Sequence, residues 1–126
     1  MTHSLQDLAK RYTAAWSSQN PVSVAAFFSP NGSLSVNDAT PAVGRAAIAR
    51  VAQSFMTAFP DLQLTMDGLT TDGENSIYRW TLEGTYGATG KRVRISGHEE
   101  WFIGVDGLVF RSLGHFDADD YARQTS

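Results

Sequence analysis

The hydrophobic pattern of this chain changes its period at Pro60. Before Pro60, apolar residues recur at steps of three and four, which places them on one face of a helix. After Pro60 they alternate with polar residues, which is the pattern of a half-buried strand. Helices gathered before a run of strands are typical of an α+β fold with the helices on one face of the sheet. The sequence therefore predicts a cone-shaped, curved antiparallel or mixed sheet that packs against three N-terminal helices and encloses a pocket.

Three helices are expected before Pro60. The first follows Ser4, a suitable N-cap, and Asn20-Pro21 ends it and begins a short second helix. A turn at residues 29–32 precedes a short strand at residues 33–36, and the third helix covers residues 44–58. The buried positions expected for the first and third helices are Leu5, Leu8, Tyr12, Trp16, Ile48, Val51, Phe55 and Phe59.

Four strands are expected after Pro60, joined by hairpin turns at Asp72-Gly73, Thr89-Gly90 and Asp106-Gly107. The first begins near Leu62, and the next three cover about residues 75–86, 91–103 and 108–116. A short acidic helix at residues 118–124 follows them. Because the chain has 126 residues and no repeats or linkers, a single domain over residues 1–126 is expected.

Glu99 is the most informative polar residue, because it occupies an apolar position in its strand. Residues 91–103 alternate between apolar and polar positions, and Glu99 falls in the apolar set with Trp101. A carboxylate in an apolar interior must be neutralised, paired or turned toward a cavity. The apolar ring of Trp101 would help to raise its pKa. A β-bulge near Gly97 would instead turn Glu99 outward, and an ion pair with a strand arginine would make it structural.

Two further residues are candidates for acid–base chemistry, and a third for hydrogen bonding to a ligand. His115 and Asp117 lie two positions apart in the last strand, where they would face the same side as a coupled pair. Asp117 is also suited to cap the tail helix, and His115 to lie at a pocket mouth or subunit contact. The ring of Tyr12 belongs to the core by default, and its hydroxyl is a candidate to reach the pocket.

Four aromatic residues are the candidate substrate contacts: Phe55, Trp80, Tyr86 and Trp101. Trp80 and Tyr86 share a strand face with Tyr78, which suits a ligand platform, a core or a dimer surface. A metal site is not expected, since Glu99 points away from its neighbours His98 and Glu100 in a strand.

Composition excludes several classes of function. A formal net charge of −3 without a basic stripe argues against a nucleic-acid partner. The absence of cysteine removes disulfides and thiolate chemistry, and fits a reducing cytoplasm. No apolar run approaches the roughly 20 residues of a membrane span, and the first residues lack the pattern of a signal peptide. A soluble, cytoplasmic protein without a membrane partner is expected.

Short motifs follow one another along almost the whole chain. They are Tyr12, Gly44-Arg45, Phe59-Pro60-Asp61-Leu62, Arg79-Trp80, Gly84-Thr85-Tyr86, Thr89-Gly90-Lys91, Asp106-Gly107, Phe116-Asp117 and Gln124. In this order and spacing they resemble the nuclear transport factor 2-like superfamily and, within it, the SnoaL-like polyketide cyclases. The resemblance implies a cone-shaped fold, a small hydrophobic ligand and a homodimer through the exposed sheet face.

The resemblance also implies roles for single residues. Tyr12, within Lys10-Arg11-Tyr12, and Glu99 match the tyrosine and the neutral acid that donate to the oxyanion in ketosteroid isomerase. Ser35 occupies the position of that enzyme's general base, and only a loop adjustment would bring Asp38 there. Asp117 matches the acid–base aspartate of the SnoaL-like cyclases.

Three functions are compatible with these residues. The first is a cofactor-independent acid–base enzyme, a cyclase or isomerase acting on a hydrophobic carbonyl compound. Such proton transfer needs no metal or redox cofactor, and none is expected. The second is a non-catalytic small-molecule binding module on the same fold. The third is a limonene-type epoxide hydrolase, for which Arg79 or Arg111 with Asp117 would form an incomplete Asp-Arg-Asp set.

Overall fold

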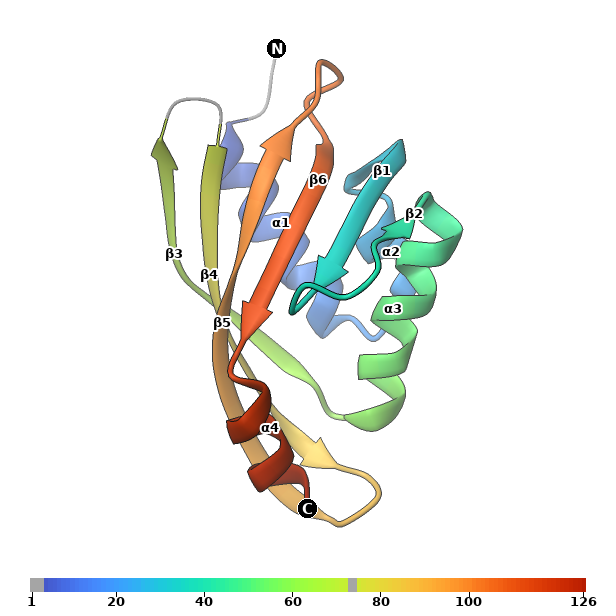
Figure 1. Ribbon diagram of the computed structural model, residues 1–126, viewed down its shortest axis with the longest axis vertical. Coiled ribbons are helices and arrows are strands. Elements are labelled where there is room, and N and C mark those ends of the chain that lie inside the picture. The colour runs from blue at the N-terminus through green and yellow to red at the C-terminus, as the bar shows by residue number, and fades with distance from the viewer. Residues whose placement is uncertain (1–3, 73–74) are drawn as a thin grey trace.

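A six-stranded mixed sheet forms the frame of the protein, in the order β2-β1-β6-β5-β4-β3 (Figure 1). The computed structural model describes residues 4–72 and 75–126, so the predicted turn at Gly73 lies outside the described residues. β1 runs parallel to β6, and the other neighbouring strands are antiparallel, which confirms the predicted α+β class. The strands are β1 (Phe28–Val36), β2 (Ala42–Val43), β3 (Gln63–Asp72), β4 (Asn75–Tyr86), β5 (Lys91–Ile103) and β6 (Val109–Phe116).

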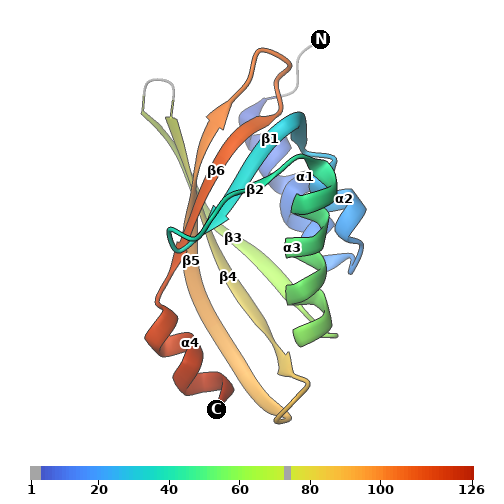
Figure 2. The same ribbon diagram turned by 45° about the vertical axis from the view of Figure 1, so that its right-hand side comes forward.

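Three helices cover one face of this sheet: α1 (Leu5–Ser17), α2 (Pro21–Ala25) and α3 (Arg45–Ala58), as Figure 2 shows. Ser4 caps α1 by accepting from the amide of Asp7, and Asn20 caps α2 with Pro21 in its first position, as predicted. A fourth helix, α4 (Ala118–Thr125), follows β6 and lies beside β5. None of the described helices combines the length and the apolar composition that a membrane crossing requires.

The first strand differs from the sequence prediction. Residues 29–32, expected to form a turn, lie inside β1, which begins at Phe28. The pairing of β1 with β6 shifts register between Phe28 and Ser33, so the residues between them need no regular partner. Pro30 lacks an N–H group, and it is tolerated in the strand because it falls in this irregular stretch.

The core lies between the helices and the sheet. Leu8, Tyr12 and Trp16 of α1 are buried, as their spacing predicted. In α3 the predicted stripe is only partly correct. Ile48 is buried as expected, while Val51 and Phe55 are half-buried, and Ala52 and Met56 are buried in addition. Val51 and Phe55 are the positions of α3 that line a cavity.

Candidate functional site

Glu99 points from β5 toward the helices, as its place in the alternation predicted. The pairing of β4 with β5 is continuous from Asn75 to Tyr86, and no bulge occurs at Gly97. Gly97, Glu99 and Trp101 therefore face the same side. The Glu99 side chain is buried, with a relative exposure of 7%. The alternative in which a bulge turns Glu99 outward is thereby excluded.

Three donors from three elements converge on the Glu99 carboxyl group. The Tyr12 hydroxyl of α1 lies 3.1 Å from both Oε1 and Oε2. Trp101 Nε1 donates to Oε1 at 3.0 Å, and Ser112 Oγ of β6 donates to Oε1 at 2.7 Å. Oε1 thus receives three donors and Oε2 receives only one. An ionised carboxylate has about four acceptor positions, so Oε2 is the oxygen with capacity left for a ligand or a proton.

Burial and hydrogen bonding act on this carboxyl group in opposite directions. Burial raises the pKa of Glu99 above its ordinary value, and the donors Trp101, Ser112 and Tyr12 partly offset that rise. Burial, together with the negative charge of Glu99, raises the pKa of Tyr12 well above its ordinary value. Tyr12 therefore remains a protonated donor at neutral pH.

Glu99 lines an apolar cavity between the sheet and the helices. The space free of protein atoms, including the open mouth, is about 620 Å³. Among the described residues that line it, Glu99 is the one carboxylate, and none is Lys or Arg. The lining residues are Trp16, Leu34, Val36, Val51, Phe55, Leu64, Trp80, Leu82, Ile95, Glu99, Gly114, His115, Phe116 and Tyr121.

One part of the cavity lining, here called the aromatic wall, consists of aromatic side chains: Trp16, Phe55, Trp80, Phe116 and Tyr121. The Phe116 ring contacts three others, with centroids 6.5 Å from Phe55, 6.2 Å from Trp80 and 5.4 Å from Tyr121. Trp16 packs edge-on against Phe55 at 6.2 Å. Among the buried side-chain nitrogen and oxygen atoms of the described residues, only Nε1 of Trp16 lacks a hydrogen-bond partner. A buried donor without a partner costs free energy, which a ligand acceptor could offset.

Gly97 fixes the position of one of these rings. Trp80 is paired with Gly97 across the β4–β5 ladder. A Cβ atom at position 97 would lie 2.5 Å from the Trp80 ring and would also clash with the carbonyl oxygen of His115. The missing side chain therefore lets the indole lie across β5, with its ring edge toward Phe116.

The structure brings some of the predicted site residues to the cavity and places others elsewhere. Phe55 and Trp80 line it with Glu99. Tyr12 and Trp101 have no exposed surface and contact Glu99 from within the core. The Tyr86 ring packs against Phe59, with centroids 5.5 Å apart, and does not line the cavity.

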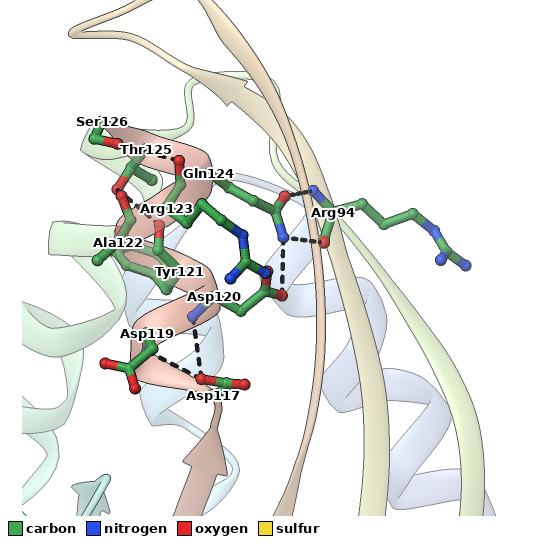
Figure 3. Close-up of polar contacts among 10 residues, drawn as sticks. All are labelled: Arg94, Asp117, Asp119, Asp120, Tyr121, Ala122, Arg123, Gln124, Thr125 and Ser126. Carbon is green, nitrogen blue, oxygen red and sulfur yellow. Dashed lines mark hydrogen bonds and ion pairs between the residues drawn. The ribbon is translucent and has the colours of Figure 1, made fainter.

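Asp117 and His115 do not meet as a pair at the cavity. Asp117 is exposed, and its Oδ1 accepts from the amides of Asp119 and Asp120, so the capping alternative is confirmed (Figure 3). His115 adjoins the cavity, but its ring lies 5.1 Å from that of His98, its cross-strand partner. Because Ser112, Gly114 and Phe116 face the helices, the His115 side chain faces the other side of the sheet. Burial lowers the pKa of His98, and His115 and Arg79 lower it further.

Sequence reasoning missed several lining residues. Trp16 was assigned only to the core, although it lies four positions from Tyr12 on the same face of α1. Tyr121 of α4 was not named, and Phe116 of β6 was named only within the motif Phe116-Asp117 and not as a lining residue. Their only sequence signal was their aromatic character, which does not distinguish a cavity wall from a core. Within residues 4–72 and 75–126, no group of three or more His, Cys, Asp or Glu side chains is arranged to hold a metal ion.

Comparison with known proteins places the chain in a family. The family described as SnoaL-like domain matches residues 9–112. A candidate polyketide cyclase from Xanthomonas campestris pv. campestris is 20% identical, with a TM-score of 0.84 and 96% of each chain covered. A ketosteroid isomerase-like fold from Catenulispora acidiphila, in complex with trimethylamine, is 11% identical, with a TM-score of 0.86, 97% of this chain covered and 94% of the other.

A third solved structure with the same fold is SalBIII, described as an epoxide hydrolase/cyclase-like enzyme in pyran ring formation in the polyether salinomycin. It is 17% identical, with a TM-score of 0.78, and the match covers 91% of this chain and 92% of the other. No curated protein matches the chain significantly. At these identities the structural likenesses establish the fold alone. The family match, which spans residues 9–112, shows that the chain belongs to the SnoaL-like domain family.

Proposed function

We propose that the chain is a cofactor-independent acid–base enzyme that acts on a small hydrophobic carbonyl compound, as a cyclase or an isomerase. The observation that carries this proposal is Glu99, a buried carboxyl group of raised pKa that lines an aromatic cavity. In its protonated form such a carboxyl group can donate to a carbonyl oxygen and stabilise the charge that develops there.

In this proposal the residues around Glu99 have separate roles. Tyr12, Trp101 and Ser112 hold Oε1, which leaves Oε2 to carry the exchangeable proton. The aromatic wall excludes water and orients a flat apolar ligand with its oxygen toward Glu99. Tyr12 is then a positioning residue that acts through Glu99. The acid–base role predicted for Asp117 stays a prediction, as does the homodimer.

A second candidate function is a binding module without catalysis. One observation favours it: Glu99 is the one carboxylate among the described lining residues, so the cavity wall offers no second acid to act as a base. Ser35, at the position of the isomerase base, is buried and carries no ionisable group. An epoxide hydrolase has less support. Arg79 donates to Thr70 and Arg111 lies over the Phe102 ring, and neither lines the cavity.

The test is exchange of the α-protons of 2-tetralone, a neutral bicyclic ketone, for deuterium in D2O, followed by proton NMR. In this exchange Glu99 protonates the carbonyl oxygen while D2O at the open mouth takes the α-proton, since the described cavity lining offers no second carboxylate as a base. A deuteron then adds to the α-carbon as the enol returns its O–H proton to Glu99. Catalysed exchange is expected in the native chain, and Glu99→Gln is expected to lower its rate by about 10²–10³-fold.

The matched control is Glu100→Gln, because Glu100 is the next residue of β5 and faces the opposite side of the sheet. It should leave the exchange rate unchanged. Binding of the ketone without exchange, seen as shifts of cavity methyl signals, would favour the binding module. Exchange that survives Glu99→Gln would contradict the role given to Glu99.

A further inference from the structure

The C-terminal helix α4 occupies an edge of the sheet that β6 leaves open. β6 ends at Phe116, which is paired with Gly97, so residues 91–96 of β5 have no strand on that side. Gln124 fills part of this gap. Its Oε1 accepts from the Arg94 amide at 2.8 Å, and its Nε2 donates to the Arg94 carbonyl oxygen at 2.9 Å (Figure 3). One side chain thus makes the two bonds that a neighbouring strand would make.

Apart from the Tyr121 ring, which packs against Phe116 and Phe59, α4 has few contacts with the rest of the chain. The helix has no fully buried residue. The Asp117 cap and the ion pair between Asp120 and Arg123 lie within the helix itself, as Figure 3 shows for both. A second polar link to β5 joins Lys91 Nζ to the terminal Ser126 carbonyl oxygen, at an exposed position. Segments with few buried contacts open at low free-energy cost, so α4 is suited to move as a unit.

The same helix supplies a wall of the cavity. Tyr121 lines it, with its ring 5.4 Å from Phe116 and 6.2 Å from Phe59 between centroids. Gln124 follows Tyr121 by three positions, which is less than one helical turn. The Gln124 and Tyr121 side chains therefore lie on the same side of α4, and the contact with Arg94 is made close to the Tyr121 ring. Residues 118–125 also fall outside the segment 9–112 that the family match covers.

We propose that α4 is a cover of the ligand cavity, and that Gln124 is the positioning residue that keeps Tyr121 closed over it by clamping the backbone of Arg94. The inference rests on the proposed ligand site, and it adds how a ligand enters. When the clamp releases, α4 swings away from β5 on the link after Phe116, and the aromatic wall opens next to Ile95. Re-forming the clamp encloses the ligand.

The test measures access to the cavity without any ligand. Because the chain has no cysteine, Ile95→Cys introduces a single thiol into the cavity wall, next to the clamped residue Arg94. The rate of its reaction with methyl methanethiosulfonate, a small neutral reagent, then reports how often the cover opens. Adding Gln124→Ala removes both hydrogen bonds to the Arg94 backbone and a third, within α4, to Asp120. We expect the labelling rate to rise by about 5- to 30-fold.

Two controls separate opening of α4 from general loss of stability. Arg123→Ala changes the neighbouring residue, whose guanidinium pairs with Asp120 and not with β5, and should leave the rate unchanged. Ala9→Cys places the thiol in the core face of α1, far from α4, where labelling requires wider unfolding. An unchanged rate for the thiol at position 95 after Gln124→Ala, or an equal rise at both thiols, would overturn the proposal.

A conservative variant tests the hydrogen-bond clamp itself. Gln124→Glu replaces the donor group Nε2 by a carboxylate oxygen, which would face the Arg94 carbonyl oxygen and Asp120 and can only accept. The labelling rate at pH 7 should therefore match that of Gln124→Ala. Near pH 4 the glutamic acid is protonated and again offers both a donor and an acceptor to Arg94. The labelling rate of the Gln124→Glu variant, divided by that of the chain that keeps Gln124, should then fall back toward one. A cover held only by packing would show no such recovery. Failure of the ketone to exchange would not affect this result, since no substrate takes part.

Discussion

The Tyr12 hydroxyl donates to both carboxylate oxygens of Glu99, at 3.1 Å from each, although 87 positions separate the two residues in sequence. The contact joins the first helix to the fifth strand inside the core. It favours the ionised form of Glu99, whereas burial favours the neutral form. The balance of these two effects decides the charge of the one carboxyl group that, among the described residues, lines the cavity.

Tyr12→Phe is expected to raise the pKa of Glu99 further. The variant removes a donor that stabilises the carboxylate, so the neutral form gains. A hydrogen bond to a charged group contributes roughly 1.5–3 kcal/mol, and the variant should lose stability on that order. Titration of the Glu99 carboxyl carbon by NMR measures the shift. Tyr78→Phe is the matched control, because the Tyr78 hydroxyl bonds to Thr13. A fall in the Glu99 pKa after Tyr12→Phe would contradict this account.

Folding stability should decrease as the pH rises through the raised pKa of Glu99. Below the ordinary value of 4.5, Glu99 is protonated in both the folded and the unfolded chain. Above pH 4.5, Glu99 ionises in the unfolded chain before it ionises in the folded one. The free energy of unfolding then falls by about 1.4 kcal/mol for each unit by which folding raises the pKa of Glu99. Urea unfolding of the native chain and of Glu99→Gln measures the difference. We expect the native chain to lose stability relative to the variant between pH 4.5 and neutrality. A constant difference would show that the pKa of Glu99 is not raised.

Gly97→Ala should destabilise the fold and displace Trp80. The added Cβ would overlap the Trp80 ring and the backbone of His115, and overpacking of this kind costs about 1–3 kcal/mol. Gly68→Ala is the matched control, since no atom lies within 4 Å of a Cβ at that strand position. Urea unfolding and the emission of the cavity tryptophans measure both effects. Equal stabilities of the two variants would show that Gly97 is not required for close packing.

Asp117→Asn should leave both the helix and the reaction intact. Asparagine caps a helix about as well as aspartate, whereas Asp117→Ala should cost about 1 kcal/mol in the stability of α4. Hydrogen exchange of the α4 amides measures the capping effect, and deuterium exchange of 2-tetralone measures the chemistry. If Asp117→Asn kept α4 protected but abolished ketone exchange, Asp117 would be the acid–base residue in place of Glu99.

The sequence by itself determined the helices, the strands β3 to β6 and the faces of the central strands, whereas β2 was not predicted. The alternation over residues 75–86 and 91–103 gave the bounds of β4 and β5, and it placed Glu99 toward the helices. These features follow from local geometry, because successive side chains of a strand point to opposite sides. The segment at residues 29–32 was mispredicted, since turn-forming residues also fit an irregular strand next to β6.

Only the tertiary structure decided which side chains meet. Ser112 reaches Glu99 because β6 pairs with β5, and Tyr12 reaches it because α1 packs on that face of the sheet. Asp117 and His115 share a strand end in sequence, yet Asp117 caps α4 and the His115 ring lies beside that of His98. Spacing along the chain fixes the direction of a side chain, but its partners depend on strand order and helix packing. Strand order and helix packing depend on how much apolar surface the whole core buries. A local sequence pattern does not contain that information.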